Sequence, residues 1–73
     1  MDNQITDAAI KAHLREIRQR LDNAAGIARA AEACSEAGNV DKAVDIANDI
    51  EQPIYEVTTL LNAASLINRL RDT

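Results

Sequence analysis

The chain has 73 residues, enough for one domain, and a domain of this size buries only about 60% of the surface that its unfolded chain exposes. Hydrophobic residues make up 47% of the sequence, but much of this is alanine and Tyr55 is the only aromatic residue, so few side chains add much burial. The formal net charge of −4 argues against a general binder of nucleic acids or anionic membranes, which attract basic proteins. A single domain over residues 1–73 therefore needs additional burial from elsewhere.

The usual supports of a small domain are missing from the sequence. Cys34 is the only cysteine and cannot form an internal disulfide, which is compatible with a reducing compartment. One histidine and one cysteine without metal-binding spacing predict no metal site, and we expect no other cofactor. The N-terminus lacks the apolar run of a secretory signal, and no run of 18 apolar residues occurs. We therefore expect a cytoplasmic protein that gains burial from a second subunit or a partner protein.

A first helix is predicted over about residues 6–37. Asn3, Thr6 or Asp7 can cap its start, and Gly38 can end it because glycine adopts the left-handed conformation without strain. Small or apolar residues recur along it with alternating spacings of four and three, at Ile10, Leu14, Ile17, Leu21, Ala24, Ala28, Ala31 and Ser35. This heptad pattern is typical of a helix that packs along another helix.

Gly26 lies inside this first helix, where glycine costs about 1 kcal/mol relative to alanine. The heptad pattern keeps its phase across Gly26, which favours one continuous helix. The alternative is a break near Asp22 and Asn23, either of which could cap a second short helix.

A second helix is predicted over about residues 41–71, with Asn39 or Asp41 as its cap. The same alternating spacing recurs at Ala43, Ala47, Ile50, Ile54, Val57, Leu61 and Ala64. Pro53 has no N–H to bond the carbonyl of Asp49, so a kink is expected near Pro53. The apolar pattern continues through it, which favours a bent helix over a reversal of the chain.

The segment from Glu36 to Asp41 is the only strong turn signal, and it predicts an antiparallel hairpin. If Asn39 is the centre of the turn, opposite residues have numbers that add up to 78. Under this register the two heptad patterns coincide, and Ile17, for example, lies opposite Leu61. The sequence therefore predicts an all-α fold that consists of a two-helix antiparallel hairpin.

A further apolar row predicts a homodimer. Each arm of about 30 residues would span about 45 Å, too long for two helices to form a compact globule alone. The row follows a seven-residue spacing and contains Ile46, Pro53, Leu60 and Ile67, joined from the first helix by Ile27 and Cys34. The simplest solution is a dimeric four-helix bundle with Ile27, Cys34, Ile46, Leu60 and Ile67 at the dimer interface. The alternative is that these are scattered surface residues, which are common.

Charge predicts how the two subunits are oriented. Residues 11–20 have a net charge of +3, from four basic and one acidic side chain, whereas residues 41–56 have −4, from one basic and five acidic side chains. An antiparallel dimer would place the basic end of one subunit against the acidic end of the other. Within the acidic segment, Asp45, Asp49 and Glu56 are predicted to dock the second subunit or another protein, with a solvated face as the alternative.

The segment from Gly26 to Pro53 resembles a single tetratricopeptide-type unit. Ala31, Gly38, Ala43 and Pro53 carry the resemblance, which covers about 28 residues. The large aromatic residues of the repeat are missing, and Pro53 comes slightly early. Because helical repeats need about three units for stability, the resemblance implies only a helical hairpin used for protein binding.

His13 provides an alternative function. A dimeric helical hairpin with a histidine on its first helix resembles the phosphoacceptor module of sensor kinases, and the Gly38–Asn39 turn between two alanine-rich helices is similar to histidine phosphotransfer domains. The sequence departs from both families, since no acidic residue directly follows His13 and the His-x-Leu-Lys-Gly motif is missing. The alternative to phosphotransfer is that His13 only flanks the contact between the two helices.

Basic residues on one side of the first helix provide another alternative: Lys11, Arg15, Arg18 and Arg29. A dimeric hairpin with such a row resembles the small RNA-binding proteins of plasmid copy control. Asp22 interrupts the row and no aromatic residue is available to stack on bases, so a solvated face is favoured and nucleic acid is not expected.

Catalytic patterns are missing as well, because no nucleophile lies at usable spacing from a base and no phosphate-binding loop occurs. We therefore expect a non-enzymatic protein-binding or regulatory module that acts as a homodimer.

Overall fold

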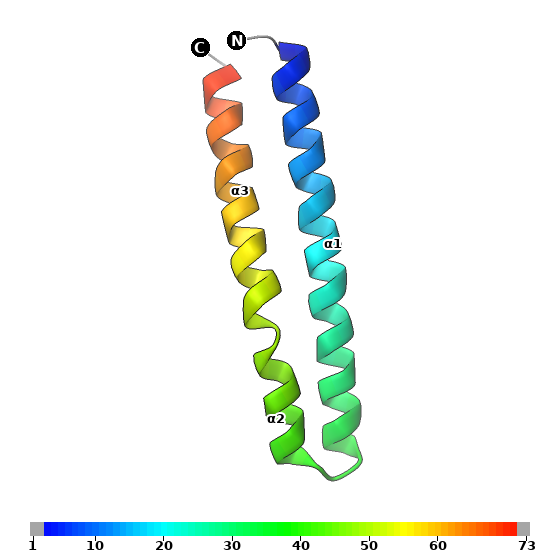
Figure 1. The fold of residues 1–73 in the computed structure, drawn as a ribbon. Coiled ribbons are helices and arrows are strands. Elements are labelled where there is room, and N and C mark those ends of the chain that lie inside the picture. Colours follow the sequence, from blue (N-terminus) through cyan, green and yellow to red (C-terminus); the bar gives the residue numbers. More distant parts are fainter. Residues whose placement is uncertain (1–2, 72–73) are drawn as a thin grey trace.

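The computed structural model describes residues 3–71 and is a helical hairpin (Figure 1). Within this range α1 spans Asn3–Glu36, α2 spans Val40–Asn48 and α3 spans Glu51–Arg71, and no strand occurs. α2 and α3 follow one another along α1 in the opposite direction, giving a rod with extents of 55 × 14 × 11 Å. None of these described helices is long and apolar enough to cross a membrane. The predicted all-α helical hairpin is confirmed.

α1 is continuous through Gly26 and begins at Asn3, somewhat before the predicted start. Ion pairs one turn apart on its surface support it: Arg18 Nη1 lies 2.8 Å from Asp22 Oδ2, and Arg20 Nη1 lies 2.6 Å from Glu16 Oε2. The alternative of a break near Asp22 is therefore wrong, and the single long helix is confirmed.

The turn between α1 and α2 depends on Gly38, whose φ of 92° lies in the left-handed region. The Gly38 amide donates to the Ser35 carbonyl at 3.0 Å, and the Asn39 amide donates to the Cys34 carbonyl at 3.1 Å. These two bonds satisfy carbonyls at the end of α1 that have no partner within the helix. The Asn39 side chain then accepts a hydrogen bond from the Lys42 amide at 3.2 Å and caps α2, so both predicted roles are confirmed.

Asp49 and Ile50 interrupt the second arm between α2 and α3. Their amides donate to carbonyls three residues earlier, each at 3.0 Å, instead of four residues earlier as in an α-helix. Pro53 lacks the N–H that would bond the Asp49 carbonyl, so a regular helix cannot pass this point. The chain keeps its direction (Figure 1), and the predicted kink near Pro53 is confirmed.

The seam between the two arms is formed largely by small side chains. Its most buried hydrophobic residues are Ala24, Ala31, Ala43 and Ala64, each 6–8% exposed. Larger side chains beside them are only half-buried: Ile10, His13, Ile17, Arg20, Ile27 and Cys34 on α1, and Ile46, Ile50, Val57, Leu60 and Ile67 on the other arm. Alanine lets the helices approach closely but contributes little buried apolar area, so the core is thin.

Two ion pairs connect the arms and agree with the predicted register. Arg71 Nη2 lies 2.6 Å from Asp7 Oδ1, and these two residues are opposite one another when Asn39 is the centre of the turn. Arg20 Nε lies 3.4 Å from Glu56 Oε1, two residues from that register. The arms are therefore aligned along their whole length as the turn predicts.

Four of the eight large side chains expected in the seam lie outside it. The heptad pattern predicts Leu14, Leu21, Ile54 and Leu61 between the helices, yet each is 43–53% exposed. The residue that precedes each of these four is buried or half-buried in the seam instead. The expectation is wrong because neighbouring rows on a helix share the same spacing, so the period alone does not determine which row faces the other helix.

Candidate binding surfaces

The two arms leave two broad faces, one on each side of the seam, and these faces differ in chemistry. Residues at seven-residue intervals share one side of a helix. We define the apolar face by eight such residues: Leu14, Leu21, Ala28 and Ser35 on α1, and Val40, Ala47, Ile54 and Leu61 on the other arm. We define the polar face by Glu16, Arg20 and Asn23 on α1, and by Asp49, Gln52 and Glu56 on the other arm.

A groove near the turn shows that both arms contribute to the apolar face. Its volume is about 250 Å³, and its lining comes from α1 and α2: Ala31, Glu32, Ser35, Val40, Ala43, Val44 and Ala47. Only Glu32 and Ser35 among these residues are polar. Val40 and Val44 are 60% and 56% exposed, so the apolar surface extends from the groove to the edge of α2.

The total surface of the rod shows how much remains uncovered. The chain has a solvent-accessible area of 5249 Å². A compact monomer of 7.9 kDa is expected to expose about 4,400 Å². The excess of roughly 800 Å² reflects the elongated shape of the rod, which leaves both sides of the seam open to solvent.

The row predicted as the dimer interface contributes to the seam within one chain. Ile27, Cys34, Ile46, Leu60 and Ile67 are half-buried between the arms, and Pro53 of the same row is buried. Among the exposed large side chains, Leu14, Leu21, Ile54 and Leu61 belong to the apolar face, and sequence reasoning assigned these four to the seam. The width of the apolar stripe on the second arm, where three adjacent rows are apolar, is the signal that could have identified a second contact surface.

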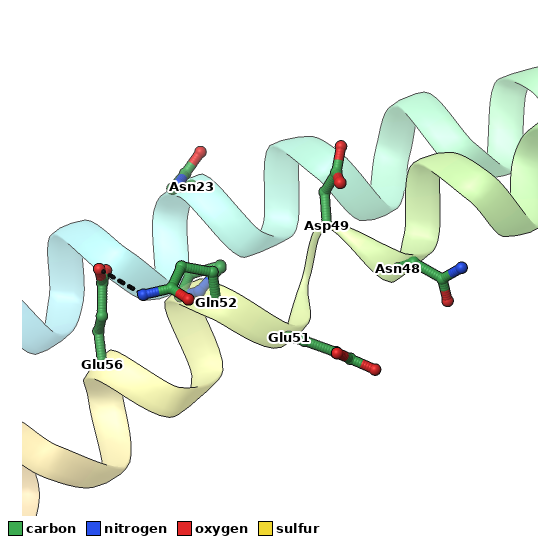
Figure 2. Close-up of a pocket in the computed structure, with 7 residues that line it drawn as sticks. Asn23, Asn48, Asp49, Glu51, Gln52 and Glu56 are labelled. Atoms are coloured by element: carbon green, nitrogen blue, oxygen red, sulfur yellow. Dashed lines mark hydrogen bonds between the residues drawn. The ribbon is translucent and has the colours of Figure 1, made fainter.

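The polar face contains a hollow where α2 ends and α3 begins (Figure 2). Its volume is about 520 Å³, and it is lined by Asn23, Asn48, Asp49, Glu51, Gln52, Pro53 and Glu56. Gln52 Nε2 donates to Glu56 Oε2 at 3.1 Å along the first turns of α3, whereas Glu51 points away from both (Figure 2). The hollow thus combines carboxylate and amide groups around the interruption of the second arm.

The three acidic residues predicted to dock a partner do not form one site. Asp49 and Glu56 line the hollow, but Asp45 lies outside it, exposed on α2. Glu56 is half-buried, forms an ion pair with Arg20 and accepts a hydrogen bond from Gln52, so part of its charge is already neutralised within the chain. Asp49 is therefore the member of this trio that combines full exposure with a place in the hollow.

His13 is half-buried in the seam, whereas the prediction placed it at the flank. Its Nδ1 lies 2.7 Å from the carbonyl oxygen of Ala9. A carbonyl oxygen can only accept, so Nδ1 carries the proton and donates to Ala9, leaving Nε2 as the free ring nitrogen. This arrangement accounts for His13 as a packed and hydrogen-bonded residue of the helix contact.

The basic row of α1 is exposed, and its charges are partly compensated. Arg18 pairs with Asp22, as a solvated face predicts. Arg20 pairs with Glu16 on the same helix, whereas Asp7 pairs with Arg71 on the other arm. Lys11, Arg15 and Arg29 are exposed to solvent.

Cys34 lies at the turn end of the seam as a free thiol, and its Sγ lies 3.5 Å from the Asn39 carbonyl oxygen. In the part of the chain that the structure describes, no three histidine, cysteine, aspartate or glutamate side chains come together as a group that could hold a metal ion.

Comparison with known proteins gives no match, whether with protein-family models, with curated proteins or with solved structures. The function must therefore be argued from the two faces of the rod.

Proposed function

We propose that the protein is a non-enzymatic protein-binding or regulatory module that acts as a homodimer, with two hairpins forming a four-helix bundle. The observation that carries the proposal is the apolar face, whose large side chains are 43–60% exposed: Leu14 and Leu21 on α1, and Val40, Ile54 and Leu61 on the other arm. Contiguous apolar surface of this kind marks interaction sites in soluble proteins. The tetratricopeptide-type resemblance of residues 26–53 has the same implication of protein binding by a helical hairpin.

The thin seam supports the same proposal. The most buried hydrophobic residues of the hairpin are alanines, and its larger seam residues are only half-buried. Two long helices with so little buried apolar area gain stability when a second pair of helices covers them. Covering the apolar face would convert a two-helix contact into a bundle with an interior, which is the role we assign to the second subunit.

The experiment that tests this proposal is a mass measurement by light scattering during size-exclusion chromatography. At tens of micromolar protein and physiological salt, we expect the mass of two chains. Dilution into the nanomolar range, followed by sedimentation of a labelled chain, should reveal dissociation to monomers. A mass of one chain at tens of micromolar would contradict the proposal.

A basic partner protein remains a further part of the proposal, at the acidic residues Asp45, Asp49 and Glu56. The hollow at the α2–α3 interruption supports docking at Asp49 and Glu56. Pull-down with the intact chain and with a variant carrying Asp45→Asn, Asp49→Asn and Glu56→Gln tests this part. We expect proteins retained by the intact chain to be lost with the variant, and retention of the same proteins by both chains would contradict it. A cytoplasmic location belongs to the proposal too, since a free thiol at Cys34 is compatible with a reducing compartment.

A further inference from the structure

We propose that a second copy of this chain covers the apolar face in an antiparallel arrangement, with its turn end over the open end of the first copy. The two-fold axis passes through the level of Leu21 and Ile54. This inference rests on the proposed homodimer and specifies its interface and its orientation.

The apolar face consists of four layers along the rod, each with one residue from each arm. From the open end to the turn these layers are Leu14–Leu61, Leu21–Ile54, Ala28–Ala47 and Ser35–Val40. The groove near the turn, which contains Ser35, Val40 and Ala47, shows that the two members of a layer lie on the same side of the seam. Successive layers are seven residues apart, or about 10 Å along the helices.

Side-chain size falls along the first three of these layers. The layers toward the open end contain large residues, and the next layer toward the turn contains two alanines. In the antiparallel arrangement Leu14 and Leu61 of one copy lie over Ala28 and Ala47 of the other. The Leu21–Ile54 layer of one copy lies over the same layer of the other copy at the axis. On both sides of the axis, large residues of one copy therefore meet small residues of the other, which allows close packing.

A parallel dimer places the same layers in a less favourable way. There α1 of one copy lies along the second arm of the other, so Leu14 meets Leu61 and Ala28 meets Ala47. The bulky layers would hold the two copies apart, and the alanine layers would leave a gap between them. A gap of this kind loses van der Waals contacts and destabilises an apolar contact.

Charges beside the apolar face favour the same orientation. Lys11 and Glu32 are both exposed on α1, at equivalent heptad positions next to the face. With the axis at the level of Leu21, α1 lies along α1 of the second copy, and Lys11 comes beside Glu32 of that copy. The parallel arrangement would bring Lys11 beside Ser65 and Glu32 beside Val44, so neither charge would gain an opposite charge.

Disulfide cross-linking of cysteine variants tests the orientation. In a full-length Cys34→Ser background, Leu21→Cys places a thiol next to the axis, and mild oxidation should give a covalent dimer. Leu66→Cys is the matched control, because Leu66 is exposed on the other side of the rod. We expect Leu21→Cys to cross-link at least about tenfold faster than the control, because association raises the effective concentration of the thiols.

A mixing experiment separates the two orientations. Equal amounts of Leu14→Cys and Ala28→Cys chains, distinguished by a tag, should form mixed disulfides if the dimer is antiparallel. Mixed disulfides between Leu21→Cys and Ile54→Cys chains, with no Leu21→Cys homodimer, would show the parallel form and overturn the inference. A dimer by light scattering with no cross-linking at any of these positions would overturn the assigned interface. A monomeric wild-type chain would instead overturn the proposed function itself.

Discussion

The polar and the apolar faces flank the same seam, but they differ in how many of their side chains find partners within one chain. On the polar face, Arg20 binds both Glu16 and Glu56, and Glu56 also accepts from Gln52, so charges of both arms are connected within the hairpin. On the apolar face, Leu14 and Leu61 remain more than half exposed, at 53% and 52%. Water can satisfy the remaining polar groups, but it offers no compensation for exposed apolar area. The comparison indicates that one chain pairs several charges of the polar face, whereas it leaves the large side chains of the apolar face uncovered.

The substitution with the largest expected effect on this difference between the faces places a charge on the apolar face. Leu61→Glu would place a carboxylate in the proposed interface without disturbing the seam, and we expect the dimer dissociation constant to rise at least about 100-fold, or roughly 3 kcal/mol. Sedimentation equilibrium measures the constant, and circular dichroism checks that the helices remain. Leu66→Glu on the other side is the control and should leave the dimer intact. Equal effects of the two substitutions would show that the apolar face has no special role.

A smaller effect is expected in the seam beneath both faces. Ala31→Leu introduces a large side chain at a position that is 8% exposed, where the helices approach closely. We expect overpacking to lower the free energy of unfolding by about 1–3 kcal/mol. Urea denaturation measures this change, with exposed Ala33→Leu as the control. If Ala31→Leu is as stable as the control, the seam is not closely packed at this alanine.

On the polar face the expected effect is smaller again. Arg20→Gln removes the ion pairs with Glu16 and Glu56, which are partly exposed to solvent. We expect a loss of about 0.5–1 kcal/mol in unfolding free energy and an unchanged dimer constant, because partly exposed pairs contribute little and the polar face is outside the proposed interface. Urea denaturation and sedimentation measure the two quantities. Dissociation of the dimer by this substitution would place the interface on the polar face.

The smallest expected effect concerns orientation. Lys11→Glu should weaken the antiparallel dimer by about 0.2–1 kcal/mol, and adding Glu32→Lys to the same chain should restore the lost affinity. Both changes are measured from dimer constants at low salt, where surface charges are screened least. The double variant has the same net charge as the wild type, so it controls for the change in charge caused by Lys11→Glu alone. If it dimerises no better than Lys11→Glu alone, the two residues do not meet across the axis.

Local signals in the sequence were sufficient to predict the course of the chain. Gly38 and Asn39 define the turn through φ and capping, and Pro53 causes the interruption that precedes it. Each of these effects depends on a few neighbouring residues and needs no knowledge of tertiary contacts. The register followed because the hairpin turn fixes which residues lie opposite one another.

The assignment of faces could not be obtained in the same way. On α1 the row that enters the seam contains His13 and Arg20, which a hydrophobic pattern counts as solvent-facing. Arg20 can be partly buried there, with its side chain 33% exposed, because its guanidinium pairs with Glu16 and Glu56. The more hydrophobic row, with Leu14 and Leu21, was therefore predicted inside but lies outside. Burial of polar residues depends on partners on both arms, which periodicity does not encode.

The interruption at Asp49 and Ile50 also divides the second arm into α2 and α3, so the helices of the rod differ in length and in local stability. α2 has nine residues, too few to persist as a helix without contacts, whereas α1 has 34. Because a regular ladder of hydrogen bonds does not connect α2 to α3, α2 can open and close without unwinding the rest of its arm. We therefore expect α2 to exchange its amide hydrogens with solvent faster than the middle of α1 does.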